Sequence, residues 1–402
     1  MHIAVWSTGY CRGFGGSEQM VNALLRRFHL EGLDTVLIAD GDPEKVYKPY
    51  FSSLPDPVEV YVDTFPNPLL CKRRPALFIA CLFKYARAAL KLINLFQRRT
   101  PDIVHLHFVS LDLFILVLYK WFFKYRLVIT FHGSDLAVTR RSRLARLKVR
   151  TAVRCADAVT AVSQQMTACL REQFGAQNVV TIPNGVDCTE LRRMAQSVAP
   201  FFEPNHFVYV GRLHPDKRVA MLVEIFKECV AAGCNRKLYI IGDGEDRESV
   251  ARLIAHHGLQ THVYMLGAMS HPQVLSAIAQ ARCLILTSKD EGCPNVILEA
   301  MALGIPVIAP SVGGVPDLVV HGLTGYLFPA DDPQLARNYI LQITHDSDAG
   351  RGMGQQCVEV VQRSFELAAT VRKYLEIYQS ILGHVEPPIS SKQIKACTGI
   401  RS

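Results

Sequence analysis

The sequence of 402 residues lacks several patterns that would assign it to a familiar class at once. Its twelve cysteines are scattered and form no Cys-x-x-Cys pair, which argues against a zinc ribbon or a disulfide framework and suits a reducing compartment. The first residues carry neither a basic segment nor a long apolar one, so we expect no secretory signal. The most apolar stretch, Leu113–Phe123, is interrupted by Lys120 and is far shorter than the ~20 residues of a membrane span. We therefore expect a soluble, cytoplasmic protein.

The composition that remains is that of an ordinary globular protein. Hydrophobic residues make up 49% of the chain and charged residues 20%, with 26 glycines and 21 prolines. These values argue against a wholly disordered, fibrous or repeat protein. At roughly 100–200 residues per domain, the length indicates two or three domains.

Acidic residues are scarce in the first half of the chain. Residues 1–195 carry 26 Lys and Arg against 16 Asp and Glu, whereas residues 196–402 carry 18 against 20. The stretch Thr64–Pro101 holds eight basic residues and no acid, and Leu136–Ala156 holds seven and none. The first half is therefore expected to face something anionic, although a solvated basic helix surface would give the same pattern.

Short apolar runs alternate with helix-length segments along both halves. The runs are rich in Val, Ile and Leu at successive positions, which is typical of strands buried on both faces of a parallel sheet. Repeated strand–helix–strand units predict an α/β fold, built twice. The strands are expected at Ile3–Trp6, Val36–Ala39, Val58–Val62, Ile103–Leu106, Leu127–Phe131, Ala158–Val162, Val179–Ile182, Phe207–Val210, Leu238–Ile241, Val263–Leu266, Cys283–Leu286, Val307–Ala309 and Gly325–Phe328.

The two halves are expected to join near Ala195–Asn205, where two prolines interrupt any clear periodicity. This predicts one domain over residues 1–195 and a second over 196–366. The last segment, 367–402, is expected to form a helix over about Leu367–Leu382, which packs back towards the first domain, and then a loose tail.

Polar, glycine-rich segments follow six of the expected strands, and ligands of parallel sheets bind at those strand ends. Because the segments come from both halves, they suggest one cleft between two facing domains. They cover residues 9–18, 132–135, 211–217, 242–244, 290–299 and 313–314.

Each of these features has a plainer explanation when it is taken alone. Gly15-Gly16 could be an ordinary tight turn, His132 a structural histidine, and Arg212 with Lys217 two surface charges. The glycines near residue 15 do not match the Gly-x-Gly-x-x-Gly fingerprint of dinucleotide-binding proteins, and Asp40 is only a weak candidate for the acid that binds ribose in such proteins. Glu291 and Glu299 are eight residues apart, and Glu299 falls within a helix where a carboxylate could accept hydrogen bonds from vicinal sugar hydroxyls.

In order and spacing, the segments resemble the family 4 glycosyltransferases over nearly the whole chain. This resemblance implies the GT-B fold, which consists of two facing Rossmann-like domains with parallel sheets and a deep interdomain cleft. The most specific part is Glu291 and Glu299 within 291–309. It is supported by Val210-Gly211-Arg212-Leu213 with Lys217, by 241–245 and 313–317, and in the first half by 15–18, 131–135 and 182–187.

The resemblance also implies a role for each site residue. Arg212 and Lys217 would neutralise the donor diphosphate, Glu291 would orient the donor sugar, and His132 would lie beside the reacting sugar. Glu299 would hold the ribose hydroxyls. Gly15, Glu18 and Asp135 would contact the acceptor or organise loops. The remaining donor-binding positions are Gly16, Gly211, Gly242, Gly292, Cys293, Pro294, Asn295 and Val296.

The reaction implied is a retaining sugar transfer from a nucleotide sugar, without cofactor or metal. Two cationic side chains can stabilise a departing diphosphate. Asp40-Gly41-Asp42 has the Asp-x-Asp pattern of a metal site, but we interpret this match as a chance feature of the turn that ends a strand. The sequence departs from the family pattern at Cys293, where Phe or Leu is more common, and at Asp317, where Glu is usual. The first departure could alter the sugar pocket.

The partners expected are a nucleotide sugar, with UDP favoured over GDP, and a lipid-linked saccharide acceptor of surface polysaccharide or lipopolysaccharide synthesis. Basic helices rich in Phe, Leu and Tyr suit an anionic membrane surface, so peripheral attachment at the inner face of the cytoplasmic membrane is expected. Nucleic acid is the rival partner, but no motif for it occurs. The alternative functions are a nucleotide-sugar epimerase of GT-B fold and a non-catalytic sugar-nucleotide-binding protein.

Overall fold

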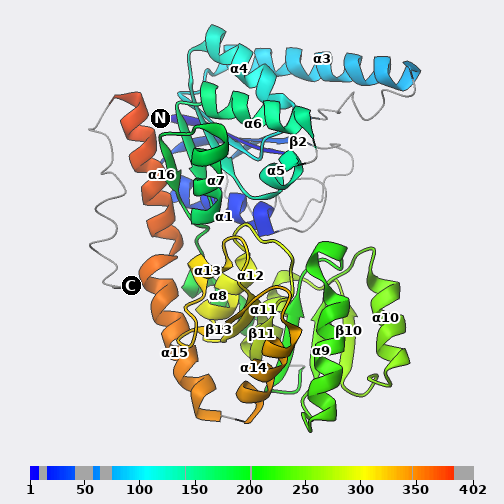
Figure 1. The fold of residues 1–402 in the computed structure, drawn as a ribbon. Coiled ribbons are helices and arrows are strands. Elements are labelled where there is room, and N and C mark those ends of the chain that lie inside the picture. The colour runs from blue at the N-terminus through cyan, green and yellow to red at the C-terminus, as the bar shows by residue number, and fades with distance from the viewer. Residues whose placement is uncertain are drawn as a thin grey trace. The chain divides into compact units, whose positions relative to one another are not determined.

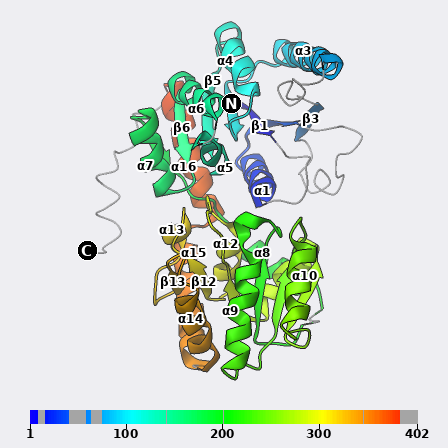
Figure 2. The same ribbon diagram turned by 45° about the vertical axis from the view of Figure 1, so that its right-hand side comes forward.

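The computed structural model describes residues 1–8, 16–40, 58–63, 75–140, 142–199, 202–345 and 347–383. The chain divides into two compact units. The first comprises Met1–Ala161, Cys169–Ile182 and the segment from Ala368 onward, and the second comprises Val162–Ala168 and Pro183–Leu367. Each unit contains a parallel sheet with helices around it (Figure 1, Figure 2).

The first unit is built on a seven-stranded sheet in the order β3-β2-β1-β4-β5-β6-β7. All of its pairings are parallel; for example, Ile3 lies opposite Thr35 on one side and Ile103 on the other. The strands are β1 (His2–Thr8), β2 (Asp34–Asp40), β3 (Glu59–Asp63), β4 (Ile103–His107), β5 (Arg126–Phe131), β6 (Ala158–Ala161) and β7 (Val179–Thr181). Their helices are α1 (Gly16–Leu30), α3 (Pro75–Arg98), α4 (Asp112–Phe123), α5 (Ser134–Ala137), the 3-10 turn η2 (Val138–Arg140), α6 (Arg143–Cys155), most of α7 (Gln164–Phe174) and α16 (Leu367–Leu382).

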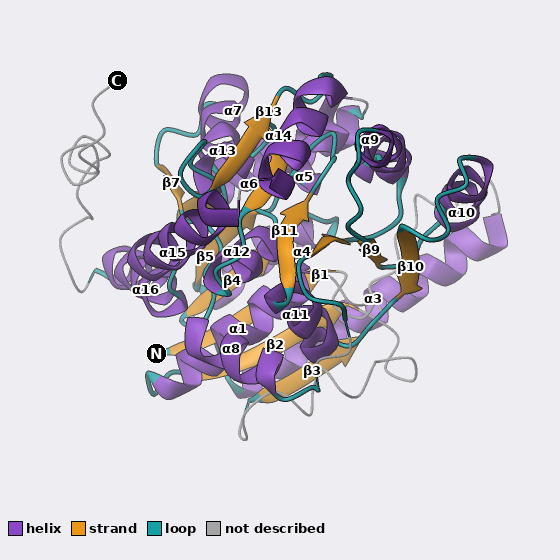
Figure 3. Ribbon diagram, turned by 90° about the horizontal axis from the view of Figure 1, so that it is seen from below, coloured by secondary structure: helices purple, strands orange, loops and turns teal. Residues whose placement is uncertain are grey.

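The second unit is built on a six-stranded parallel sheet in the order β10-β9-β8-β11-β12-β13. Its strands, shown in orange in Figure 3, are β8 (His206–Val210), β9 (Leu238–Ile241), β10 (Val263–Gly267), β11 (Ala281–Ile285), β12 (Val307–Pro310) and β13 (Gly325–Phe328). The helices are α8 (Cys188–Gln196), the 3-10 turn η3 (Pro215–Lys217), α9 (Val219–Ala231), α10 (Arg247–His256), α11 (His271–Ala279), α12 (Asn295–Ala302), α13 (Val315–Leu318), α14 (Pro333–His345) and α15 (Ser347–Ser364).

The α/β architecture expected from the sequence is confirmed, since each of the thirteen predicted strands is present within a few residues of its expected bounds. The apolar runs form strands because both of their faces are covered. All five residues of β4 and all four of β9 are buried, and burying such side chains is the main favourable contribution to folding.

Helix α8 packs with the second unit, although residues 188–195 were expected to belong to the first domain. It buries Cys188, Leu191 and Ala195 and contacts α11 and α12. The N-terminal part of the first unit therefore ends at Ile182, upstream of the segment expected to link the domains, and the chain returns to this unit at Ala368.

Helix α16 begins at Leu367 and ends at Leu382, as the sequence indicates. It belongs to the first unit, where Tyr374 and Tyr378 are buried. None of the described helices is long and apolar enough to cross a bilayer.

Each sheet has one place where the strand order reverses direction. In the first unit this place lies between β1 and β4, and in the second it lies between β8 and β11. Loops leaving the carboxyl ends of such strands diverge and open a crevice, which is where open α/β sheets bind ligands. These two strand pairs therefore mark where a site is expected in each unit.

Candidate functional site

In the second unit, two oppositely charged side chains meet at the place where the strand order reverses. Lys217 lies after β8 and Glu291 lies after β11, and these strands are neighbours in the sheet. The Nζ of Lys217 is 2.6 Å from Oε1 of Glu291. Ser288 donates its hydroxyl to the same carboxylate oxygen at 2.6 Å. The Glu291 side chain is 11% exposed and that of Lys217 29% exposed, so the pair is largely shielded but still accessible.

The end of β11 fixes the backbone that carries Lys217. The Thr287 hydroxyl donates to the carbonyl oxygen of Lys217 at 2.9 Å. In return, Nε of Arg218 donates to the carbonyl oxygen of Thr287 at 3.0 Å. The Arg218 backbone lies in the left-handed region, with φ of 50°, which turns the chain from η3 into α9. Lys217 is therefore held by contacts that the sequence did not indicate.

Arg212, the other cation assigned to the diphosphate, follows β8 by two residues and is exposed. Its guanidinium makes no hydrogen bond or ion pair with any residue that the structure describes. Arg212 is therefore free to bind an anion, whereas Lys217 is already paired.

Glycines allow the loops beyond the strands to pack backbone against backbone. A Cβ on Gly242, whose φ is 139°, would lie 1.9 Å from the carbonyl oxygen of Gly211. A Cβ on Gly313 would lie 1.7 Å from the carbonyl oxygen of Glu291. The amide of Gly242 donates to the carbonyl of Gly267 at 2.8 Å, so this predicted donor-binding glycine contributes close packing. Gly292 is approached in the same way by Gly314.

The segment that opens α12 is fixed by Asn184. Its side-chain amide donates to the carbonyl oxygen of Cys293 at 3.1 Å and to Oδ1 of Asn295 at 2.7 Å. Burial raises the pKa of the Cys293 thiol to about 12, so this thiol is neutral and inert at neutral pH. Pro294 supplies no side-chain cap to α12, whose first turn includes Val296. An uncapped helix N-terminus attracts anionic groups.

Glu299 is buried within α12 and is paired with a histidine that the sequence did not single out. Nε2 of His271, the first residue of α11, lies 2.9 Å from Oε1 of Glu299. Burial alone would lower the pKa of His271, but its hydrogen bond and attraction to Glu299 raise that pKa overall. The second carboxylate oxygen of Glu299 can still accept hydrogen bonds, which is the chemistry expected for holding a diol.

In the first unit, three aromatic rings cluster at the carboxyl ends of β4 and β5. His132 directly follows β5, and its Nε2 lies 3.0 Å from Nδ1 of His107, the last residue of β4. The ring of Phe108 stacks on that of His132, with centroids 4.4 Å apart. Burial lowers the pKa of His132 to about 4, so its imidazole is neutral at physiological pH. Of these three residues, the sequence predicted only His132.

A second buried histidine, His105, ties α16 to this sheet. Its Nδ1 lies 2.6 Å from the hydroxyl of Tyr378 in α16, and its Nε2 lies 2.7 Å from the hydroxyl of Thr130. Burial lowers the pKa of His105 to about 3. Both ring nitrogens are therefore satisfied, and this histidine is a structural one.

Asp135 organises the backbone around His132. Its carboxylate accepts hydrogen bonds from the backbone amides of His132 at 3.1 Å and Val109 at 3.3 Å. Burial nevertheless raises the pKa of Asp135 to about 6, because these bonds only partly compensate for lost hydration.

Gly16 and Glu18 lie in the first turn of α1. Gly15 lies outside the described residues, as do Gly41 and Asp42.

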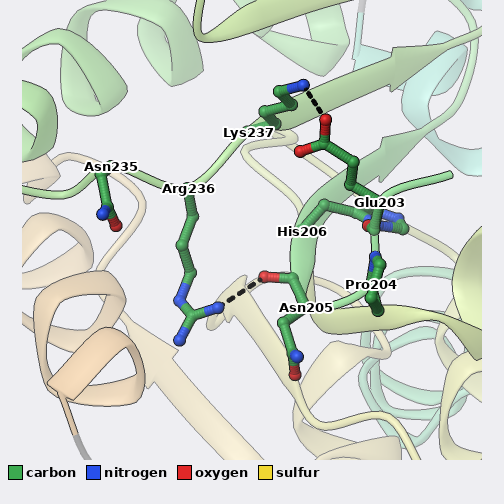
Figure 4. A pocket seen from close by; sticks show the side chains of 7 residues that line it. All are labelled: Glu203, Pro204, Asn205, His206, Asn235, Arg236 and Lys237. Carbon is green, nitrogen blue, oxygen red and sulfur yellow. Dashed lines mark hydrogen bonds and ion pairs between the residues drawn. The ribbon is translucent and has the colours of Figure 1, made fainter.

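A pocket of the second unit lies at the opposite ends of its strands from the Lys217–Glu291 pair (Figure 4). The pocket is formed at the amino ends of β8 and β9, and Arg236 donates there to the carbonyl oxygen of Asn205 at 3.1 Å. No predicted site residue lines it. Because ligands of parallel sheets bind at the carboxyl ends of strands, the Lys217–Glu291 region is the stronger candidate. The pocket is lined by Glu203, Pro204, Asn205, His206, Asn235, Arg236 and Lys237.

Comparison with known proteins yields two family models that together match well over half of the chain. The model described as "Glycosyltransferase Family 4" matches residues 14–190, and "Glycosyl transferases group 1" matches residues 192–359. One relative, the N-acetyl-alpha-D-glucosaminyl L-malate synthase of Bacillus anthracis, is 26% identical over 302 residues, which is 73% of this chain and 78% of the relative. The capsular polysaccharide biosynthesis glycosyltransferase CapM of Staphylococcus aureus is 24% identical, covering 76% of this chain and 83% of its own.

Solved structures agree on the fold. Anabaena Alr3699/HepE, in complex with UDP-glucose, superimposes with a TM-score of 0.74 at 21% identity, over 94% of this chain and 100% of that one. Together with the two parallel sheets, this likeness confirms the GT-B fold that the family resemblance implied.

Proposed function

Because the chain belongs to the family 4 glycosyltransferases, we propose that it transfers a sugar from a nucleotide sugar to a saccharide acceptor with retention of anomeric configuration. One observation carries the proposal. Lys217 and Glu291, the cation and the carboxylate assigned to the donor, lie in contact where the strand order of the second sheet reverses. Arg212, on the same loop as Lys217, has its charge available.

The chemistry follows from where charge develops. When the bond between the anomeric carbon and the phosphate oxygen breaks, negative charge grows on the nucleoside diphosphate. Arg212 and Lys217 stabilise that charge, together with the N-terminus of α12. Before that bond breaks, when the donor binds, Glu291 exchanges its bond to Lys217 for hydroxyls of the donor sugar. Glu299 receives the ribose hydroxyls through the oxygen that His271 does not occupy.

The acceptor step needs no separate nucleophile–base pair. The acceptor hydroxyl oxygen bonds to the anomeric carbon on the face from which the phosphate departs. A phosphate oxygen takes the hydroxyl proton, and the nucleoside diphosphate leaves. His132 is assigned to the reacting sugar, to which its neutral imidazole would contribute a hydrogen bond.

The reaction is proposed to need no metal ion, because two side-chain cations and the N-terminus of α12 are assigned to the diphosphate. Activity is therefore expected to persist in excess EDTA. Loss of activity in EDTA that is rescued by Mn²⁺ would contradict this part of the proposal and would direct attention to Asp40 and Asp42.

A UDP-hexose or UDP-N-acetylhexosamine is proposed as the donor, with GDP-mannose as the next choice. Support comes from Anabaena Alr3699/HepE, which has been solved with UDP-glucose, and from the Bacillus anthracis relative, whose name specifies an N-acetylglucosaminyl group. The acceptor is proposed to be a lipid-linked saccharide of surface polysaccharide or lipopolysaccharide synthesis. The relative CapM, whose name specifies capsular polysaccharide biosynthesis, supports the surface-polysaccharide part of this proposal.

The surface of the first unit supports a lipid-linked acceptor. Helix α3, the long blue helix in Figure 1, exposes apolar side chains over its first half, and Phe83 is 73% exposed. Helix α4 exposes Trp121 at 80%. The two helices pack on each other, since the hydroxyl of Tyr119 donates to the carbonyl oxygen of Ala89. The other large apolar side chains exposed on them are Leu77, Ile79, Leu82, Leu90, Phe114, Leu118 and Phe122.

Basic residues accompany these exposed apolar groups. Lys84 and Arg87 are exposed on α3 and Lys124 directly after α4, whereas Lys91 is paired with Asp63. Apolar side chains interleaved with Lys and Arg are typical of a helix that lies in an anionic membrane interface. We therefore propose cytoplasmic localisation with peripheral attachment to the inner face of the membrane. Lys72, Arg73 and Arg74 of the same acid-free stretch lie outside the described residues.

The stereochemical course tests the proposal directly. Nucleotide release should require both a nucleotide sugar and an acceptor, and NMR of the first-formed product should show the anomeric configuration of the donor. An inverted product would overturn the retaining assignment. Conversion of the nucleotide sugar to its epimer without an acceptor would favour the epimerase instead.

A further inference from the structure

Two histidines of the first unit, His107 and His132, lie close enough for one to fix the tautomer of the other. His107 ends β4, and its residue position pairs with Thr130 of β5, two residues before His132. The Nδ1 of His107 is 3.0 Å from Nε2 of His132. His107 is 1% exposed, and its other nitrogen, Nε2, is buried without a hydrogen-bond partner among the described residues. His132 is only partly buried, and its Nδ1 has no partner in the described part of the chain.

Phe108 holds the plane of the His132 ring. The two rings stack at 4.4 Å with an interplanar angle of 26°. The backbone of Phe108 has φ of 68°, a conformation that bulky residues rarely adopt and that persists only where surrounding contacts impose it. The contacts that impose it are made by Val109, the residue after Phe108. The amide of Val109 donates to Asp135, and its carbonyl oxygen accepts from Lys148. The ring of His132 is thus held at its face by Phe108 and at its edge by His107.

Counting protons leaves two arrangements for the pair. Burial lowers the pKa of His132 to about 4 and that of His107 well below its usual value, so both rings are neutral and carry one N–H each. If His132 donated from Nε2, the proton of His107 would sit on Nε2, where it would be a buried N–H without an acceptor. Such orphaned donors are rare in proteins, and incompletely satisfied acceptors are less so. If His107 donates from Nδ1, no N–H is left orphaned inside the unit.

We propose that His107 is a positioning residue: it donates its Nδ1–H to Nε2 of His132 and so holds His132 in the tautomer protonated at Nδ1. His132 then presents an N–H donor. The identity of its hydrogen-bond acceptor rests on the proposed function: the Nδ1–H of His132 is directed at an oxygen of the transferred sugar. A nitrogen that already carries a proton cannot remove one from the acceptor hydroxyl, so His132 orients the sugar and is not the base of the reaction.

The tautomer can be measured without any substrate. In protein labelled with ¹⁵N at its histidines, long-range ¹H–¹⁵N correlation spectra distinguish a protonated ring nitrogen from a bare one. His132→Ala identifies the signals of that residue. We expect a protonated Nδ1 and a bare Nε2 in the wild type, and loss of this preference in His107→Phe. Protonation of His132 at Nε2 in the wild type would overturn the proposal.

Matched variants separate this role from a merely structural one. Tyr378→Phe removes the partner of His105 and should leave the His132 signals unchanged. His107→Asn keeps a side-chain N–H near the position of Nδ1. We expect His107→Phe to lower kcat by about 10- to 100-fold, as loss of an orienting partner typically does, with little change in donor KM. His107→Asn should recover most of the loss, and equal activity of His107→Phe and wild type would contradict the proposal.

These measurements also keep the inference apart from the proposed function. The expected tautomer in a chain that transfers no sugar would refute the function alone. Sugar transfer with His132 protonated at Nε2 would refute the inference alone.

Discussion

Lys217 and Glu291 are 74 residues apart in the sequence, yet their side chains form an ion pair of 2.6 Å in the second unit. The contact exists because β8 and β11, which precede them, are neighbours in the sheet. Removing one member of this largely shielded pair is costly, because the remaining charge is left without its partner. In the proposed donor complex, the diphosphate and the sugar would supply the new partners.

Lys217→Ala should lower kcat by about 10²–10³-fold, the usual cost of removing one group that stabilises developing negative charge. The fold should be retained, which circular dichroism can verify. Lys227→Ala, at an exposed position of α9, is the control and should behave as wild type. Because Lys217 and Glu291 touch, the double variant with Glu291→Ala should lose less than the two single losses combined. Independent losses would show that the two residues act separately.

Glu299→Gln should act mainly on donor binding. The carboxylate accepts a hydrogen bond from His271 and is assigned to the ribose hydroxyls. A neutral amide accepts more weakly and through one oxygen only, so KM for the donor should rise about 10-fold while kcat changes little. Glu248→Gln, at a position of α10 whose side chain is 87% exposed, supplies the control. An unchanged KM for Glu299→Gln would place the ribose elsewhere.

The stability of the first unit should depend on pH through Asp112. This residue begins α4 and is 2% exposed, and burial raises the pKa of its carboxyl to about 7, with the nearby charge of Asp40 adding to the effect. In the unfolded chain the group titrates near 3.9. Between pH 4 and pH 7 the carboxyl of Asp112 is therefore protonated in the folded state and ionised in the unfolded chain. The free energy of unfolding consequently falls as pH rises from about 4 to about 7.

Asp112→Asn removes this dependence. The melting temperature of the variant relative to wild type should therefore increase between pH 5 and pH 8 in differential scanning fluorimetry. Asp331→Asn, at a position 97% exposed, should show a constant difference. The assignment fails if the Asp112→Asn difference is also constant with pH.

Liposome co-sedimentation tests membrane attachment. Wild type should bind phosphatidylglycerol vesicles and not neutral phosphatidylcholine vesicles. Binding should fall steeply by ~0.5 M NaCl, since salt screens charges beyond a few ångströms at that strength. Each basic residue close to an anionic surface contributes about 1 kcal/mol, so replacing Lys84, Arg87 and Lys124 with Gln should weaken binding clearly.

The matched control removes the same charge from the second unit by replacing Arg193, Lys227 and Arg252 with Gln, and it should still sediment. Phe83→Ser with Trp121→Ser should weaken binding at constant charge. If wild type does not bind anionic vesicles at low salt, the acceptor is a soluble molecule and the lipid-linked proposal is wrong. Binding that depends on protein concentration, with self-association through α3, would assign the apolar surface to a second copy of the chain.

The strands could be predicted because their signal is local. A run such as Leu238–Ile241 is apolar at every position and short, which is typical of a strand covered on both faces. The order of strands in each sheet is not local, so the contact between Lys217 and Glu291 could not be derived from spacing. The position of α8 was missed for a similar reason, since its buried face is defined by α11 and α12.

The missed site residues had weak signals in the sequence. His107 and Phe108 end an apolar run, where a histidine looks like any other buried strand residue. The positive φ of Phe108 leaves no trace in the sequence. His271 could have been noticed as the first residue of a helix after Ser270, but its pairing with Glu299 depends on how α11 packs against α12.

The most direct test of the account is a thermal-shift screen against UDP-, GDP-, ADP- and dTDP-sugars, with Lys217→Ala and Glu299→Gln measured beside the wild type. A ligand at about 100 times its Kd stabilises a protein by roughly 2.7 kcal/mol, which is a shift of several degrees. One class of nucleotide sugar, UDP-linked by our proposal, should raise the melting temperature of the wild type and stabilise both variants far less at the same concentration. Equal stabilisation of all three proteins, or no effect of any nucleotide sugar on the wild type, would contradict a donor site at Lys217, Glu291 and Glu299.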